Sequence, residues 1–384
     1  MAELGRAALL VTLGLAAYAL VVGAWAAAAQ RRRAAASARN ALVATFFTSA
    51  VAIAILFVAF ARRDFSFAYV AGLSSDLLPT PYALTALWGG AAGSLLLWLV
   101  VLTGFAALAV LRARRSERDL LPWVVPVLAG VVVAFAFLLV MVQSPFETQV
   151  APSDGRGLNP SLQNPYMVAH PVFLYLGYVG LTVPWAFAMG ALLSGKTDER
   201  WIVATRRWTL VAWAFLGVGQ LVGAKWAYEE VGWGGYYAWD PVENAALMPW
   251  LAATAFLHSV MIQEKRGMLR VWNTSLVSLT FSLSLFGTFL TRSGVITSIH
   301  SFSKSGVGPW FLAFIVVAVA VSTALIVWRL PLLRTRAKLE SLVSREAAFL
   351  YNNLLLVALC LTILWGVVWP LVSEAVRGES VVVG

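Results

Sequence analysis

Long apolar runs separated by short polar connections dominate the chain. Ten runs are long enough to cross a membrane, and none alternates strictly between apolar and polar residues. Membrane strands need only about ten alternating residues, so the pattern favours helices. The predicted spans cover roughly residues 7–29, 41–61, 82–111, 121–142, 168–193, 208–224, 241–263, 272–291, 309–328 and 348–370. We therefore expect an all-α polytopic membrane protein in which residues 1–384 form a single transmembrane helical domain.

Basic residues fall in alternate connections between these spans. Such connections hold 20 of the 28 Lys and Arg residues, in the segments 31–39, 112–118, 196–207, 265–270 and 329–345. Because Lys and Arg mark the cytoplasmic side, both termini are predicted to lie outside. The net charge of +10 is thus a signal of topology and not of nucleic-acid binding. The first basic cluster follows the first run, unlike that of a cleaved secretory signal.

Composition agrees with this picture and places function on one side. The chain is 60% hydrophobic and 12% charged, which excludes a soluble domain. Cys360 is the only cysteine, so an intrachain disulfide and a CxxC motif are excluded, and we expect a small buried residue. The longer connections, at 62–81, 144–167, 225–240 and 292–308, all lie on the predicted outer side. Binding residues concentrate on such loops.

The stretch KWAYEEVGWGGYYAWDPVENAALMPW, residues 225–250, divides into two parts. Asp240, Pro241 and Glu243 spell a capping box with proline at the first helical position, so these acids can be purely structural. The segment before them crowds rings between glycines. Interfacial belts account for many of the 17 Trp residues but need no glycines, whereas a flat ligand does need close backbone approach. The predicted platform for a planar apolar ligand comprises Trp226, Trp233, Gly234, Gly235, Tyr236, Tyr237, Trp239 and Asp240.

The three histidines suggest iron ligands. His170 precedes Pro171, so we expect it in extended backbone at the outer entrance of a helix. His300 lies in the outer connection before the ninth span. Either one alone is typical of a hydrogen-bonded surface residue, but as a pair beside the aromatic loop they predict axial ligation of an iron porphyrin. His258 lies about 26 Å along its helix, toward the inner half of the membrane.

His258 and the candidate propionate donors each allow two interpretations. His258 is either a neutral side chain bonded to a neighbouring helix or a ligand of a membrane haem whose second ligand is not in these 384 residues. Haem propionates need cationic donors, for which Arg292, Lys225 and Arg63 are candidates, and Arg292 is favoured because it ends a helix beside the His300 loop. Each could equally be an ordinary snorkelling residue.

Four segments carry a family resemblance over nearly the whole chain. GWGGYYAWDPVENAALMPW resembles the tryptophan-rich WWD signature of haem-handling membrane proteins in cytochrome c maturation. The segments NPSLQNPYMVAHPVFLYLGYVG, WGGAAGSLLLW and TFLTRSGVITSIHSF resemble the CcmF-type cytochrome c haem lyases specifically. The resemblance implies that His170 and His300 ligate incoming haem over the WWD loop. It also implies a transmembrane haem b, with His258 as one ligand.

The resemblance implies an activity as well. A periplasmic chaperone delivers haem, which is attached by thioethers to the CxxCH motif of apocytochrome c, together with subunits that handle the apocytochrome thiols. The membrane haem keeps the iron reduced with electrons from quinol, and the protein lies in the bacterial inner membrane with its functional face in the periplasm. Such a haem lyase needs positioning and redox control, not an acid–base pair or nucleophile.

The sequence departs from the family in a few places and leaves rival functions to weigh. The family has Trp at Tyr236 and Tyr237 and an acid at Ala92, and its second membrane histidine and large periplasmic domain lie beyond residue 384. A haem exporter of the same WWD family would share the loop. A secondary transporter would use Glu229, Glu230 and Asp240, but no inverted repeat is visible. A quinol-oxidising cytochrome b would need paired histidines within its helices.

Overall fold

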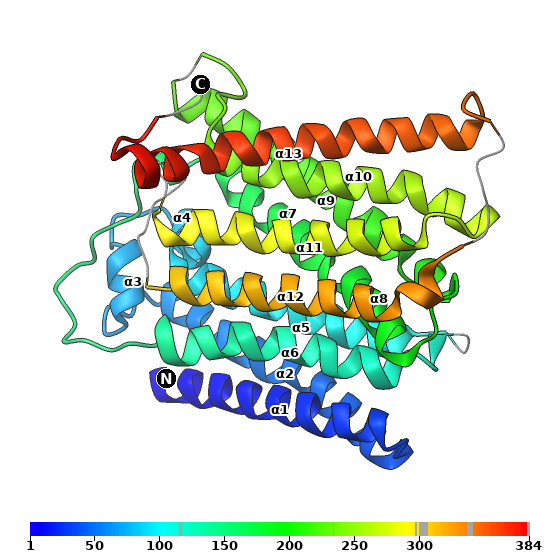
Figure 1. The fold of residues 1–384 in the computed structure, drawn as a ribbon. Helices are drawn as coiled ribbons and strands as arrows, with labels where there is room; N and C mark the ends of the chain where they lie inside the picture. Colours follow the sequence, from blue (N-terminus) through cyan, green and yellow to red (C-terminus); the bar gives the residue numbers. More distant parts are fainter. Residues whose placement is uncertain (115–116, 233, 296–297, 299–305, 336–340, 382–384) are drawn as a thin grey trace.

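The computed structural model describes residues 1–114, 117–232, 234–295, 298, 306–335 and 341–381, which fold as long, nearly aligned helices with short helices at one end (Figure 1). The helices are α1 (Ala2–Ala28), α2 (Arg32–Ala61), α3 (Ala68–Leu73), α4 (Thr80–Thr85), η1 (Ala86–Trp88), α5 (Ala91–Arg112), α6 (Leu121–Phe137), η3 (Leu138–Val142), η4 (Pro160–Leu162), α7 (Pro165–Gly180), α8 (Thr182–Ser194), α9 (Arg200–Glu230), α10 (Pro241–Arg266), α11 (Arg270–Ser293), α12 (Gly308–Leu333) and α13 (Arg345–Arg377).

The ten predicted spans are confirmed. The described residues contain ten helical segments long and apolar enough to cross a membrane, counting α6 with η3 and α7 with α8 as one span each. α1 begins and α13 ends at the same end of the bundle (Figure 1). An even number of spans requires this, and it agrees with the expectation that both termini share a side.

The third predicted span starts later than expected. Residues 82–111 were predicted as one run, but the chain forms α4 and η1, turns at Gly89–Gly90 and begins α5 only at Ala91. A side chain at Gly93 would collide with the Leu87 carbonyl oxygen, so glycine is needed for this turn. The Tyr69 hydroxyl secures it, since it donates to that carbonyl at 2.9 Å and accepts from the Gly90 N–H at 3.1 Å.

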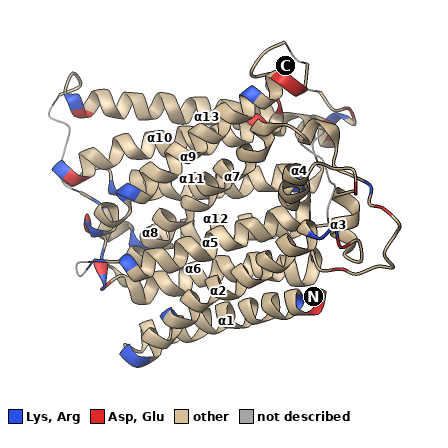
Figure 2. Cartoon of the chain, turned by 180° about the vertical axis from the view of Figure 1, so that it is seen from behind, with Lys and Arg blue, Asp and Glu red and all other residues tan. Residues whose placement is uncertain are grey.

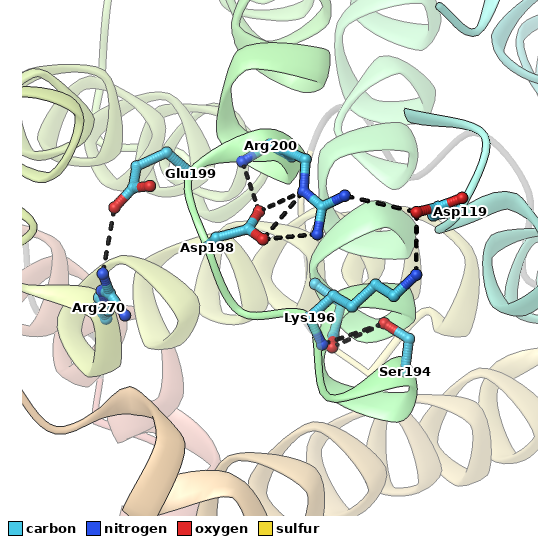
Figure 3. Close-up of polar contacts among 8 residues, drawn as sticks. Asp119, Ser194, Lys196, Asp198, Glu199, Arg200 and Arg270 are labelled. Carbon is cyan, nitrogen blue, oxygen red and sulfur yellow. Dashed lines mark hydrogen bonds and ion pairs between the residues drawn. The ribbon is translucent and has the colours of Figure 1, made fainter. Parts of the chain in front are cut away.

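Charged residues gather at the two ends of the bundle, and the helices between the ends are mostly uncharged (Figure 2). We call the end with the connections 28–32, 112–121, 194–200, 266–270 and 333–345 the basic end, and the opposite end, with α3, α4 and the 143–164 and 231–240 connections, the loop end. Many bases at the basic end form ion pairs (Figure 3). Asp119 bridges Lys196 at 3.1 Å and Arg200 at 3.6 Å, and Arg270 meets Glu199 at 3.2 Å. The Lys196 ammonium holds the pKa of Asp119 below its usual value.

Candidate functional site

The start of α10 is built as the capping motif predicts. The Asp240 carboxylate accepts from the Val242 N–H at 3.0 Å, and the Glu243 carboxylate accepts from the Asp240 N–H at 3.4 Å, with Pro241 at the first position. Ser298 also donates its hydroxyl to Asp240 at 2.8 Å. The predicted structural role of both acids is therefore confirmed, and Asp240 additionally contacts the connection that follows α11.

Asp240→Ala is expected to destabilise the protein by about 1 kcal/mol, because the cap and the Ser298 hydrogen bond are both lost. Asp240→Asn keeps an acceptor oxygen and is expected to retain most of the stability. Thermal unfolding of the two purified variants in the same detergent measures the difference. Equal unfolding temperatures for Ala and Asn would show that the cap does not stabilise α10.

The aromatic loop at 231–240 exposes flat side chains at the loop end. Tyr236, Tyr237 and Trp239 are 54%, 46% and 38% exposed. Gly232 and Gly234 have φ values of +72° and +73°, a conformation that side-chain-bearing residues avoid. Tyr236 stacks on Tyr228 of α9, with ring centroids 4.6 Å apart. The glycines thus turn the loop so that its rings stay accessible.

Asn244 fixes this loop onto α10, a role that the sequence did not reveal. Its side chain is fully buried, accepts from the Tyr237 hydroxyl and donates to the Trp239 carbonyl at 3.2 Å. Burial raises the pKa of the Tyr237 phenol to about 12, so the hydroxyl remains a donor. Trp239 has φ +59°, a strained value for a bulky residue, and its ring lies near Gly366 of α13.

One predicted platform residue, Trp226, is buried. Trp226 is only 1% exposed, and its indole N–H donates to the Ser161 carbonyl at 2.8 Å. Its ring is therefore packed inside the protein and does not present a face to a ligand. Trp233 lies outside the described residues, as does His300.

His170 lies inside a helix, which corrects the expectation of extended backbone before Pro171. α7 begins five residues earlier, at Pro165, because Asn164 caps it by accepting from the Tyr166 N–H at 2.8 Å. Pro171 is then tolerated within the helix. The cap and a proline at the first position outweigh the local preference of the residue before a second proline.

The orientation of His170 is set by two glycines of α9. Its Nδ1 lies 2.8 Å from the Gly219 carbonyl oxygen. A carbonyl can only accept, so Nδ1 carries a proton and donates it to this bond. A side-chain carbon at Gly223 would lie 2.5 Å from Nδ1, so only glycine leaves room for the imidazole. Gly219 and Gly223 form a GxxxG motif, which lets membrane helices approach closely.

His170 and Arg292 line the same small cavity. It has a volume of about 100 Å³, with walls from α5, α7, α10 and α11. Arg292 Nη2 donates to the Tyr175 hydroxyl at 2.6 Å. The space holds a few water-sized groups and not a porphyrin. The lining comprises Trp88, Gly89, Trp98, Met167, His170, Pro171, Leu174, Tyr175, Tyr178, Val242, Gly287, Thr288, Thr291 and Arg292.

The other two cationic candidates have different surroundings. Lys225 forms an ion pair with Glu229 at 3.1 Å and lies over the Tyr166 and Tyr228 rings. Arg63 donates to backbone carbonyls of the 74–79 connection at 3.1 and 2.8 Å. Of the three, only Arg292 shares a cavity with His170.

His258 lies far from this cavity along α10 and has a partner on another helix. Asn352 of α13 is within 2.7 Å of its Nδ1, and the Phe349 ring centroid is 6.0 Å away. The predicted hydrogen bond to a neighbouring helix is thus present. Haem ligation by His258 stays a prediction. Sequence reasoning missed Asn352, because nothing in its local pattern points to His258.

Comparisons with known proteins agree with one another. A family model described as cytochrome C assembly protein matches residues 88–297. The cytochrome c-type biogenesis protein CcmF of Pseudomonas aeruginosa is 43% identical over 388 residues, covering 100% of this chain and 58% of that protein. Its namesake in Escherichia coli is 40% identical, with 100% and 60% covered. A solved structure of cytochrome c heme lyase CcmF has a TM-score of 0.82 and 34% identity, covering 97% of this chain and 57% of that one.

The extent of these matches settles the family. The family model covers more than half of the chain. The two CcmF relatives align along the whole of this chain. The chain spans about half to three fifths of the length of the curated relatives it matches. It therefore belongs to the cytochrome c assembly protein family, in the branch of the CcmF-type biogenesis proteins.

Proposed function

We propose that this protein is a haem lyase component that binds haem from a periplasmic chaperone and directs its thioether attachment to the CxxCH motif of apocytochrome c. The observation that carries the proposal is the fixed imidazole of His170. Its Nδ1–H is held by the Gly219 carbonyl, and it shares a cavity with Arg292 near the aromatic loop. Metal-ligating histidines characteristically donate their second ring nitrogen to such an acceptor.

The residues of the loop end fit a haem. Nε2 of His170 is the ring atom able to bind iron, Tyr236, Tyr237 and Trp239 offer accessible apolar faces, and Arg292 supplies a cation for a propionate. His300 is proposed as the second axial ligand. Because the cavity beside His170 is too small for a porphyrin, ligation of haem iron by Nε2 would require this cavity to widen.

The chain's own residues position the haem instead of reacting with it. In the proposed reaction a cysteine sulfur bonds to a vinyl carbon while the thiol hydrogen goes to the other vinyl carbon. Bound haem supplies the vinyl groups and the redox-active iron. The rigid loop, fixed by Asn244, would hold both vinyls toward the incoming CxxCH segment, which is brought by subunits that handle its thiols.

We further propose that His258 binds a transmembrane haem b, which supplies electrons taken from quinol. A half-buried histidine within a membrane helix suits this role, because its Nδ1 partner Asn352 fixes the ring orientation. The structure places Asn352 Nδ2 beside Nδ1. Ligation of iron through Nε2 would require the flipped amide, whose Oδ1 accepts from the Nδ1–H. The second iron ligand is proposed to come from outside these residues.

The clustering of bases supports an orientation in the bacterial inner membrane. The basic end would face the cytoplasm and the loop end the periplasm, where apocytochrome and chaperone are met. In this proposed orientation the His170 cavity and the aromatic loop would lie on the periplasmic face.

The absorption spectrum of the protein purified from its own membranes tests the haem assignments. A Soret band is expected, and His258→Ala is expected to remove the portion that belongs to the membrane haem. Phe349→Leu, which changes a neighbouring ring but no ligand, serves as the matched control. A colourless wild-type protein, or a His258→Ala spectrum identical to the control, would contradict the proposal.

A further inference from the structure

Three arginines surround a second cavity, at the basic end of the bundle. Its volume is about 480 Å³, and it lies between the start of α2, the end of α5 and the start of α6. Arg32 and Arg39 reach it from α2, and Arg118 reaches it from the connection before α6. The remaining lining residues are Ala35, Ala36, Val110, Leu111, Ala113, Leu121, Pro122 and Val125.

Two sets of lining residues meet at this cavity. On α2 the lining positions are 32, 35, 36 and 39, and at the start of α6 they are 118, 121, 122 and 125. The α2 set follows the spacing i, i+3, i+4 and i+7 and lies on one helix face. In the second set, Arg118 precedes α6, and Leu121, Pro122 and Val125 belong to its first turns. Each set begins with an arginine, which apolar residues follow. The site therefore combines cationic groups with an apolar wall.

These arginines differ from other bases at the same end in their pairing. Lys196, Arg200 and Arg270 have carboxylate partners within 4.0 Å (Figure 3). Within the described part of the chain, no carboxylate lies that close to the guanidinium of Arg32, Arg39 or Arg118.

The two nearby acids are engaged by other groups. Glu117 is buried and accepts from the Arg114 backbone N–H at 2.9 Å, and Asp119 is engaged by Lys196. Arg39 donates from Nη2 to Asn40 at 3.1 Å, but its Nε is buried and has no hydrogen-bond partner among the described residues. A buried guanidinium N–H calls for an acceptor. The cavity thus offers the N–H donor at Arg39 Nε to an acceptor, with the positive charges of Arg32 and Arg118 beside it.

We propose that this cavity binds the phosphate headgroup of an anionic phospholipid, such as phosphatidylglycerol. One guanidinium group can donate two parallel hydrogen bonds to a phosphate. Basic pockets between membrane helices recognise anionic headgroups. The apolar lining from Val110, Leu111 and Val125 accommodates the first part of an acyl chain. A lipid, with its charge at the interface and its chain in the bilayer, matches both halves of the site. The site is separate from haem binding and does not rest on the proposed function.

Native mass spectrometry of the protein from mixed phosphatidylglycerol and phosphatidylcholine nanodiscs tests the site. Wild type is expected to retain phosphatidylglycerol, and the R39Q/R118Q double variant is expected to retain at least tenfold less. R33Q/R114Q is the matched control, because it removes two positive charges at the same end from residues that do not line the cavity. Equal retention by R39Q/R118Q and R33Q/R114Q would overturn the proposal.

Two further arms complete the test. R118Q alone is measured in parallel, because Arg118 is exposed outside the helices and its loss should not disturb packing. If the double variant does not fold, unchanged lipid retention by R118Q overturns the proposal and reduced retention supports it. Inorganic phosphate is added in excess to wild type. Continued retention of the lipid supports a lipid site, whereas displacement by free phosphate overturns it.

Discussion

Replacing His170 with alanine is expected to abolish covalent haem attachment to c-type cytochromes while leaving the protein in the membrane. The substitution removes the proposed iron ligand. Loss of a residue that only supports a metal ligand already lowers metal affinity or activity about 10–100-fold. Removal of the ligand itself should cost at least as much. Haem staining of c-type cytochromes on denaturing gels measures the result, and an immunoblot of the membrane fraction reports the amount of protein. The same outcome is expected for His300→Ala.

Chemical rescue distinguishes ligation from packing. His170→Gly leaves a hole that free imidazole can fill, so added imidazole is expected to restore part of the haem staining. Val168→Ala, two residues away on α7, is the matched control and should retain normal staining. Unchanged staining in His170→Ala would remove this residue from the proposed site.

Gly223→Ala is expected to disable the protein nearly as completely, although residue 223 carries no functional side chain. The added carbon would lie 2.5 Å from His170 Nδ1, so the imidazole must leave the Gly219 carbonyl. Overpacking of this kind costs about 1–3 kcal/mol, which a membrane protein can often survive. We expect normal insertion, a lowered unfolding temperature and haem staining close to that of His170→Ala.

Gly14→Ala is the matched control for this substitution. Gly14 lies in α1, and nothing outside its own stretch of helix lies within 4 Å of the added carbon, so neither stability nor staining should fall. If Gly223→Ala stains like wild type, the close contact between α7 and α9 does not position His170.

The spans and the cap of α10 could be predicted because both depend on local sequence. Apolar length alone determines which segments can cross a bilayer, and Asp240, Pro241 and Glu243 act within one helical turn. The break before α5 was missed because the apolar run continues through it. Glycine at position 93 permits the turn and Tyr69, far away in sequence, secures it.

The candidate site was harder to predict because its supports come from distant segments. The roles of Asn244 and Asn352 depend on partners that no periodicity reveals. Trp226 was expected to be accessible, since an aromatic residue near a loop carries no mark of burial. The α9 segment GQLVG, residues 219–223, is a GxxxG motif and could have signalled a close helix contact. It could not have identified His170 as the residue in that contact.

α13 touches both regions proposed to handle haem. Its Gly366 packs near the ring of Trp239 in the aromatic loop, and its Asn352 contacts His258. These two points are 14 residues apart, or about 21 Å along a helix. An α-helix resists compression over such a length. Because α13 is one continuous helix, it fixes the spacing between the aromatic loop and the surroundings of His258.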